Sequence, residues 1–130
     1  MPQVDRAVLH KLAWKSETTR RYASALVRAG MACHRRGVMH FNNDDVAEHE
    51  QPLDRTTVGA CVRLLSAENV IAHWRGTIDA EEIHGGMRRS TRPGNHEHRN
   101  QLYQLTSYGL ANRWLVANGT EPEPVQGELF

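Results

Sequence analysis

The residues of this sequence best suited to binding a charged partner are the arginines in the segment from His84 to Arg99. That segment holds four arginines against one glutamate, and Gly85, Gly86 and Gly94 make its backbone pliable. The arginines are Arg88, Arg89, Arg92 and Arg99. Guanidinium groups pair with phosphate oxygens, so such an arm can lie along a polyanion such as double-stranded DNA or enter its minor groove. The alternative is a solvated loop whose arginines only aid solubility.

Histidine and cysteine offer much weaker signals for metal binding or catalysis. His84, His96 and His98 form no ligand set with cysteines or carboxylates, and Cys33 and Cys61 lack the C-x-x-C spacing of a zinc site. We therefore interpret both cysteines as small buried apolar groups. No nucleophile, base and orienting acid stand at motif spacing, and no glycine loop that could cradle a phosphate is present. The sequence predicts a protein without catalysis, metal or cofactor.

The last five residues form a second candidate binding segment. Gln126-Gly127-Glu128-Leu129-Phe130 resembles the bacterial sliding-clamp-binding peptide, Gln-x-x-Leu-Phe, which in several replication and repair proteins lies at the C-terminus behind a flexible linker. The resemblance implies that Leu129 and Phe130 enter a pocket of the clamp while the Gln126 amide hydrogen-bonds beside it. The preceding run Glu121-Pro122-Glu123-Pro124 is typical of an extended linker. A chance match, or docking of the tail on its own core, is the alternative.

Length and composition limit the protein to a small range of classes. The chain has 130 residues and a mass of 14.7 kDa, which is the common size of one domain. No apolar run approaches the roughly 18 residues that a membrane span requires. Because the opening residues Met1 to Arg6 contain no apolar stretch of the signal-peptide kind, we expect a cytoplasmic protein with no membrane partner.

The net charge of +1 hides blocks of opposite sign. Residues 1–41 carry eight Lys and Arg against two Asp and Glu, whereas residues 42–82 carry three against nine. Residues 83–118 are basic again, with five against one, and residues 119–130 hold three glutamates and no base. Such segregation indicates one face directed at a polyanion and another directed away from it. The alternative is a solvated surface with chance clustering.

Several helices must position these charges. Apolar residues at helical spacing predict helices over about 4–12 and from a Ser16 cap to Arg36, with Gly37 beyond the end. Asn42 and Asn43 are placed to cap a short helix that directs Val46 and Ala47 inward, and Pro52 ends it. A helix capped by Asp54 should then run to about Glu68. Its buried face is expected to comprise Val58, Cys61, Val62 and Leu65.

A hairpin and a last helix complete the expected order of elements. After Asn69, a plausible left-handed cap, residues 70–74 and 101–105 have strand character, and we expect residues 76–100 between them to form a mobile tip. A helix over about 107–117 should direct Leu110, Trp114 and Leu115 to the core. The whole is mainly α with a small β-hairpin.

This order resembles a winged helix-turn-helix protein. The run from Thr57 to Ile71 is similar to the recognition-helix pattern of winged-helix regulators, and Tyr103-Gln104-Leu105-Thr106-Ser107-Tyr108-Gly109 resembles the Y-x-L-T-x-x-G of MarR-like proteins. The resemblance covers about residues 20–117. It implies a winged helix-turn-helix domain over 1–118, with N-terminal helices, and a flexible tail over 119–130.

The same resemblance implies that one face of the recognition helix contacts DNA. The side chains expected to reach DNA from it are Arg55, Thr56, Thr57 and Arg63. Gly59 and Ala60 occupy positions where the family often has a polar or basic side chain that contacts the DNA bases. The acidic residues of the preceding helix, Asp44, Asp45, Glu48 and Glu50, would repel a phosphate backbone unless they turn aside.

Three functional hypotheses follow. The first is a non-enzymatic DNA-binding protein of phage or mobile-element type, which acts in DNA replication and docks on the polymerase sliding clamp through QGELF. The second is a MarR-like transcriptional regulator that dimerises through its N-terminal helices. The third is a protein-interaction adaptor or inhibitor built on a winged-helix scaffold.

Overall fold

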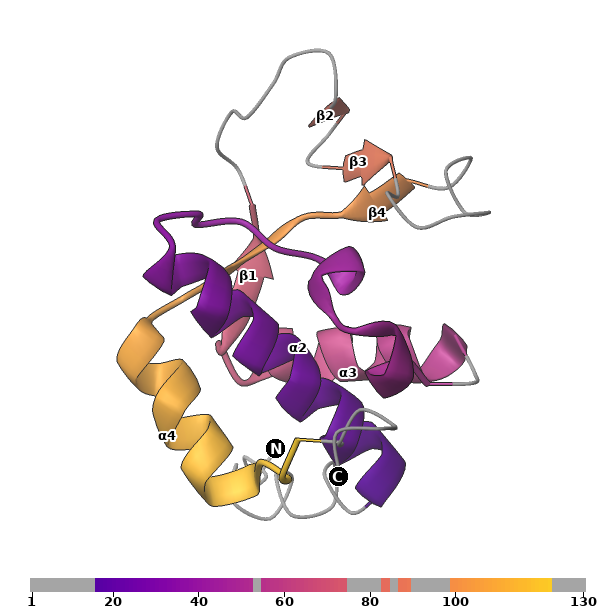
Figure 1. Cartoon of the computed structure of the whole chain (residues 1–130), viewed down its shortest axis with the longest axis vertical. Helices are drawn as coiled ribbons and strands as arrows, with labels where there is room; N and C mark the ends of the chain where they lie inside the picture. Colours follow the sequence, from indigo (N-terminus) through magenta and orange to yellow (C-terminus); the bar gives the residue numbers. More distant parts are fainter. Residues whose placement is uncertain (1–15, 53–54, 75–82, 85–86, 90–98, 123–130) are drawn as a thin grey trace, which may run out of the picture.

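A computed structural model describes residues 16–52, 55–74, 83–84, 87–89 and 99–122 of the chain. Within these ranges the protein is mainly helical, as predicted, with three α-helices, two 3-10 helices and short antiparallel strands (Figure 1). The predicted helix over 4–12 and the proposed Asp54 cap lie outside the described residues. No described helix combines the length and apolar character needed to cross a membrane.

Helix α2 (Glu17–Arg35) is the central element of the core. The Ser16 Oγ atom accepts a hydrogen bond from the Thr19 N–H at 3.3 Å, which confirms the predicted cap. The helix ends where Gly37 adopts a φ of +82°, a left-handed conformation that glycine takes without strain. The buried face of α2 includes Tyr22, Leu26 and Val27.

The acidic stretch after α2 forms two 3-10 helices, η1 (Asn43–Asp45) and η2 (Glu48–Glu50), where one α-helix was predicted. The Asn42 Oδ1 atom accepts from the Asp44 N–H at 2.9 Å, and the Asp45 carboxylate accepts from the Asn42 N–H at 2.8 Å. This capping box satisfies the turn locally, and burial of Val46 in extended conformation then ends it. Ala47, predicted to point inward, is exposed because it follows that break.

Helix α3 (Arg55–Ala67) packs across α2 through the predicted stripe. Cys61 and Leu65 are fully buried, and Val58 and Val62 pack partly buried at the edge of the core. The Cys61 thiol donates to the Thr19 carbonyl of α2 at 3.3 Å. Cys33 is also buried and forms no disulfide, so both cysteines behave as the predicted core groups. Asn69 has a φ of +62°, which confirms the left-handed cap.

Strands β1 (Ile71–His73) and β5 (Tyr103–Leu105) form the predicted antiparallel hairpin pair, with Ile71 opposite Leu105. On the other side of β5, Phe41 makes an isolated antiparallel bridge to Tyr103, with N–H to carbonyl distances of 3.0 and 2.8 Å. The segment before Asn42 therefore adds to the sheet edge through Phe41. Across this layer the order is Phe41, β5, β1.

The connection between β1 and β5 contains a second sheet, so its prediction as only a mobile tip was wrong. Strands β2 (Ile83–His84), β3 (Met87–Arg89) and β4 (Arg99–Gln101) form an antiparallel sheet in that order. Backbone pairing continues from the β1–β5 pair, because the Trp74 N–H donates to the Leu102 carbonyl at 2.9 Å. This sheet projects from the helices, at the top of Figure 1.

Helix α4 (Tyr108–Asn118) begins at a Ser107 cap and packs beside α2. Ala111 and Trp114 are its buried residues and Leu115 packs partly buried, whereas Leu110, predicted in the core, is only half-buried outside the core cluster. The helix is rotated about its axis relative to the prediction, and the Trp114 indole N–H donates to the Glu68 carboxylate at 2.9 Å. That rotation places Ala111, and not Leu110, against α2.

Candidate nucleic-acid interface

The outward face of α3 combines small residues with one well-placed cation. Arg63 and Thr56 are exposed, and Thr57, Gly59 and Ala60 are half-buried. A Cβ atom on Gly59 would meet only the Arg63 Nη1 atom, at 3.9 Å, so the guanidinium lies over a position without a side chain. No carboxylate among the described residues pairs with Arg63. The backbone of Arg55 begins the helix, and its side chain lies outside the described part.

The acidic stretch before α3 is partly neutralised by other elements. The Asp45 carboxylate is engaged in the capping box with Asn42. The Glu50 carboxylate pairs with the Arg28 guanidinium of α2 at 3.4 Å, with side chains only 17% and 27% exposed respectively. Asp44 is half-buried and Glu48 is exposed. At Asp45 and Glu50, local contacts therefore reduce the repulsion that this stretch would exert on a phosphate backbone.

The β2–β4 sheet gives the predicted arginines a defined backbone register. Arg89 lies opposite Arg99, and Arg88 lies opposite Asn100 on one side and Ile83 on the other. Arg92, His96 and His98 lie outside the described residues, and His84 pairs with Met87 at the sheet edge. In the described part of the chain, no group of three His, Cys, Asp or Glu residues is arranged to hold a metal ion.

An aromatic cluster at the root of this sheet was not predicted. The His40 and Trp74 rings have centroids 5.6 Å apart, and the Tyr103 ring lies 5.7 Å from His73 and 6.3 Å from Phe41. Burial raises the pKa of the Tyr103 hydroxyl above its usual value of 10.0. The sequence indicated only the alternating strand residues around β1. The cluster also needs His40 and Phe41, which come from a segment distant in the chain, so strand alternation alone could not predict it.

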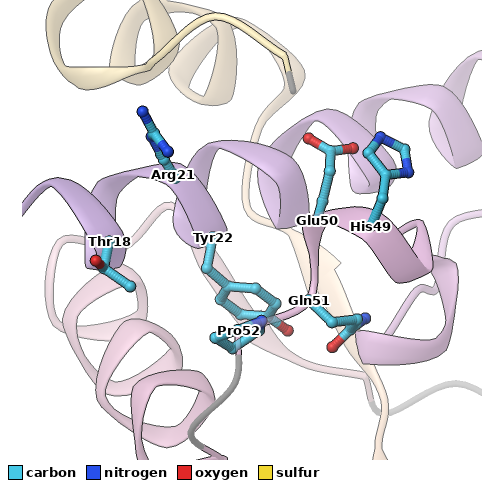
Figure 2. Close-up of a pocket in the computed structure, with 7 residues that line it drawn as sticks. All are labelled: Thr18, Arg21, Tyr22, His49, Glu50, Gln51 and Pro52. Carbon is cyan, nitrogen blue, oxygen red and sulfur yellow. The ribbon is translucent and has the colours of Figure 1, made fainter. Parts of the chain in front are cut away.

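A pocket of about 290 Å³ opens between the first turns of α2 and the η2 segment. It is lined by Thr18, Arg21, Tyr22, His49, Glu50, Gln51 and Pro52. Figure 2 shows the Tyr22 ring beside Gln51 and Pro52, and the Tyr22 hydroxyl donates to the Asn43 side chain. The Glu50 carboxylate that lines this pocket pairs with the Arg28 guanidinium of α2.

The proposed clamp-binding residues Gln126, Leu129 and Phe130 lie outside the described part. The chain that leads to them is anchored where it leaves α4. The Thr120 N–H donates to the Ser24 Oγ atom at 2.9 Å, and the Arg28 guanidinium donates to the Thr120 carbonyl at 2.6 Å. Within the predicted tail, residues 119–130, Thr120 is therefore held on α2 by these two hydrogen bonds.

Comparisons of the chain with protein-family models, curated proteins and solved structures found no match.

Proposed function

We propose that this is a non-enzymatic winged helix-turn-helix protein that binds double-stranded DNA through α3 and the β2–β4 sheet. The observation that carries the proposal is the order of connections. Helix α2, the Phe41 bridge, the η1–η2 turns, α3 and the β1–β5 pair follow one another as helix, strand, short helix, helix and hairpin. That order is the one implied by the winged-helix resemblance of Thr57 to Ile71 and Tyr103 to Gly109.

The register of the β2–β4 sheet supports a phosphate partner for it. Like charges directly opposite each other on neighbouring strands destabilise a sheet, in the range of about 0.2–1 kcal/mol. Arg89 and Arg99 occupy opposite positions in the β3–β4 ladder. A phosphate bound near both residues would offset this repulsion, since each guanidinium then gains a charge-assisted hydrogen bond.

Helix α3 supplies the base-reading part of the proposal. Among the described side chains, Arg63 supplies the one guanidinium on the outward face of α3, and Thr56 and Thr57 lie about two turns earlier for phosphate contacts. Gly59 and Ala60 let the helix approach a groove closely, because neither has a side chain beyond Cβ. Arg63 is therefore assigned the base contact, and the sheet arginines supply affinity that does not depend on sequence.

The replication role rests on the C-terminal resemblance. With Thr120 anchored on α2, residues 121–130 can extend about 30 Å at ~3.3 Å per residue, which lets Gln126, Leu129 and Phe130 reach a clamp beside the bound DNA. The protein would thus be held at replicating DNA by two contacts. This arrangement suits a protein of phage or mobile-element type.

Duplex binding measured by fluorescence anisotropy over a range of salt concentrations tests the DNA contact. Replacing Arg88, Arg89 and Arg92 with Ala should weaken binding to all sequences and lower the salt slope by about 2 to 3. The matched control, with Lys at the same three positions, should retain most of the slope. Arg63→Ala should instead change the preference among sequences. Binding that does not depend on salt would contradict the proposal.

Capture of the sliding clamp tests the tail. Replacing Leu129 and Phe130 with Ala should abolish pull-down of the purified clamp and leave the affinity for DNA unchanged. If the wild-type chain binds DNA but not the clamp, the replication role is wrong and the transcriptional-regulator hypothesis takes its place.

A further inference from the structure

The arginines of α2 differ in whether a carboxylate compensates them. Before Gly30, Arg21 pairs with Glu17 at 3.0 Å, and Arg28 pairs with Glu50 at 3.4 Å. At the C-terminal end, Arg35 and Arg36 are exposed, and neither has a carboxylate partner in the part of the chain that the structure describes. The positive charge of the first basic block is therefore concentrated at this end.

Neutral groups hold the arginines at this end in place. The Arg35 Nη1 atom donates to the Tyr108 hydroxyl of α4 at 2.7 Å, and the His34 ring lies 5.1 Å from the Tyr108 ring. The Arg36 Nη2 atom donates to the Cys33 Sγ atom at 3.4 Å. These contacts order the two guanidinium groups without neutralising them, so less conformational entropy is lost when an anion binds.

Arg113 of α4 adds a third cation to the same end of the molecule. It is exposed, and its Nη1 atom lies 3.9 Å from the point where a Cβ atom on Gly109 would be. Cations in the last turn of α2 are favoured by the helix dipole, which alone could explain Arg35 and Arg36. That explanation fails for Arg113, because its guanidinium reaches back over the first turn of α4, where the dipole disfavours a cation.

These residues lie on the opposite side of the molecule from the start of α3. Figure 1 shows the end of α2 and the start of α4 together at the upper left, whereas α3 begins at the right of the view. The proposed duplex contacts α3 and the β2–β4 sheet at the top of the view, so the end of α2 and the start of α4 lie outside the elements assigned to it and are open to a separate partner. We call this surface the α2–α4 patch and define it as His34, Arg35, Arg36, Tyr108 and Arg113.

We infer that the α2–α4 patch binds the phosphate backbone of a second DNA segment, so that one molecule joins two duplexes. The inference rests on the proposed function, which supplies the first contact. Charge complementarity identifies the occupant: ordered, uncompensated guanidiniums suit phosphate oxygens, which accept from their planar donors.

A bridging experiment with the full chain tests this inference. A duplex is immobilised on beads, the protein is added, and capture of a second, fluorescent duplex is measured, while the affinity for one duplex is measured separately at low DNA concentration. The double variant R35A/R113A should reduce capture of the second duplex about tenfold and lower the salt slope of capture by about 2. Its affinity for a single duplex should stay within about twofold of wild type.

Arg21→Ala is the matched control, because it removes one exposed positive charge from the same helix at a position already paired with Glu17. It should leave capture unchanged. Tyr108→Phe, which removes the acceptor of Arg35 without changing the charge, should give an intermediate loss. Arg21, Arg35 and Arg113 are exposed and Tyr108 is half-buried against the core. Far-ultraviolet circular dichroism checks that each variant is folded.

The outcomes separate the inference from the proposed function. If the wild-type protein binds no duplex, the proposed function fails. If it binds one duplex and captures no second one, or if R35A/R113A captures as much as wild type, this inference alone is overturned. Equal loss of single-duplex affinity and of capture would also overturn it, because the patch would then belong to the first DNA contact.

Discussion

The arginines of α2 before and after Gly30 have different environments, and we refer to these two parts of the helix as its halves. Arg28 is mostly buried and joins three segments, because its guanidinium pairs with Glu50 and donates to the Thr120 carbonyl. Arg35 and Arg36, one to two turns beyond Gly30, are exposed and contact only neutral acceptors. A count of basic residues therefore overestimates the positive charge exposed on the surface, because the fold decides which arginines pair with a carboxylate.

The largest expected effect is at Gly30, the boundary between the two halves. A Cβ atom there would lie 2.8 Å from two carbons of the buried Phe41 ring and 3.1 Å from the Leu105 side chain, so Gly30→Val must displace these packed side chains. We expect a loss of about 3 kcal/mol in the free energy of unfolding, measured with urea. Gly59→Ala on α3 is the control: its space is open, and it should stabilise the protein by about 0.5–1 kcal/mol. Equal effects at the two glycines would contradict the packing.

Alkaline pH should loosen the N-terminal half of α2 through Cys61, which packs on it. Burial raises the pKa of this thiol from 9.0 to about 12. The folded protein thus holds the proton more tightly than the unfolded chain. Its stabilising contribution is complete below pH 9 and is lost as the pH rises towards 12, at about 1.4 kcal/mol per pH unit.

Urea unfolding at pH 8 and pH 11 measures this contribution. Wild type should lose about 2 kcal/mol more than Cys61→Ala over that interval. Tyr103, whose pKa is also raised, is present in both proteins, so its contribution cancels. A wild-type loss no larger than that of the variant would show that Cys61 is not held in its protonated form.

Removing Arg28 should have the next largest effect. Arg28→Ala leaves the half-buried Glu50 carboxylate and the Thr120 carbonyl without their guanidinium partner, and we expect a loss of about 2 kcal/mol. Arg28→Lys keeps the charge but not both contacts, so it should recover only part of the loss. Thermal unfolding followed by circular dichroism distinguishes the three proteins. An Arg28→Ala protein as stable as wild type would show that the contacts of Arg28 with Glu50 and Thr120 do not contribute to stability.

The smallest effects on stability should come from the exposed arginines at either end. Arg21→Ala and Arg35→Ala should each change the free energy of unfolding by less than about 0.5 kcal/mol, because exposed pairs and single surface hydrogen bonds contribute little. The same urea titration measures both. If Arg35→Ala destabilised the protein as much as Arg28→Ala, the C-terminal end of α2 would be structural as well, and the contrast between the halves would disappear.

Much of the fold followed from local patterns along the chain. The cap at Ser16, the stop at Gly37 and the left-handed Asn69 each depend on a few neighbouring residues, and the structure has all three. The stripe that buries Cys61 and Leu65 follows from helical periodicity alone. Where the structure differs from the prediction for the acidic segment, burial of Val46 breaks that segment into η1 and η2. The β2–β4 sheet lies within the connection expected to be a mobile tip.

The candidate interface divides in the same way. The basic and acidic blocks, the arginines between residues 88 and 99, and the clamp-like Gln126, Leu129 and Phe130 are properties of the amino-acid order alone. Which charges are compensated is a tertiary property, because Arg28 meets Glu50 and Arg35 meets Tyr108 across 22 and 73 positions of the chain. Residue types and local spacing thus determined the helices, their ends and the chemistry available. Only packing between distant segments decided where positive charge stays exposed, since electrostatic compensation depends on distance in space.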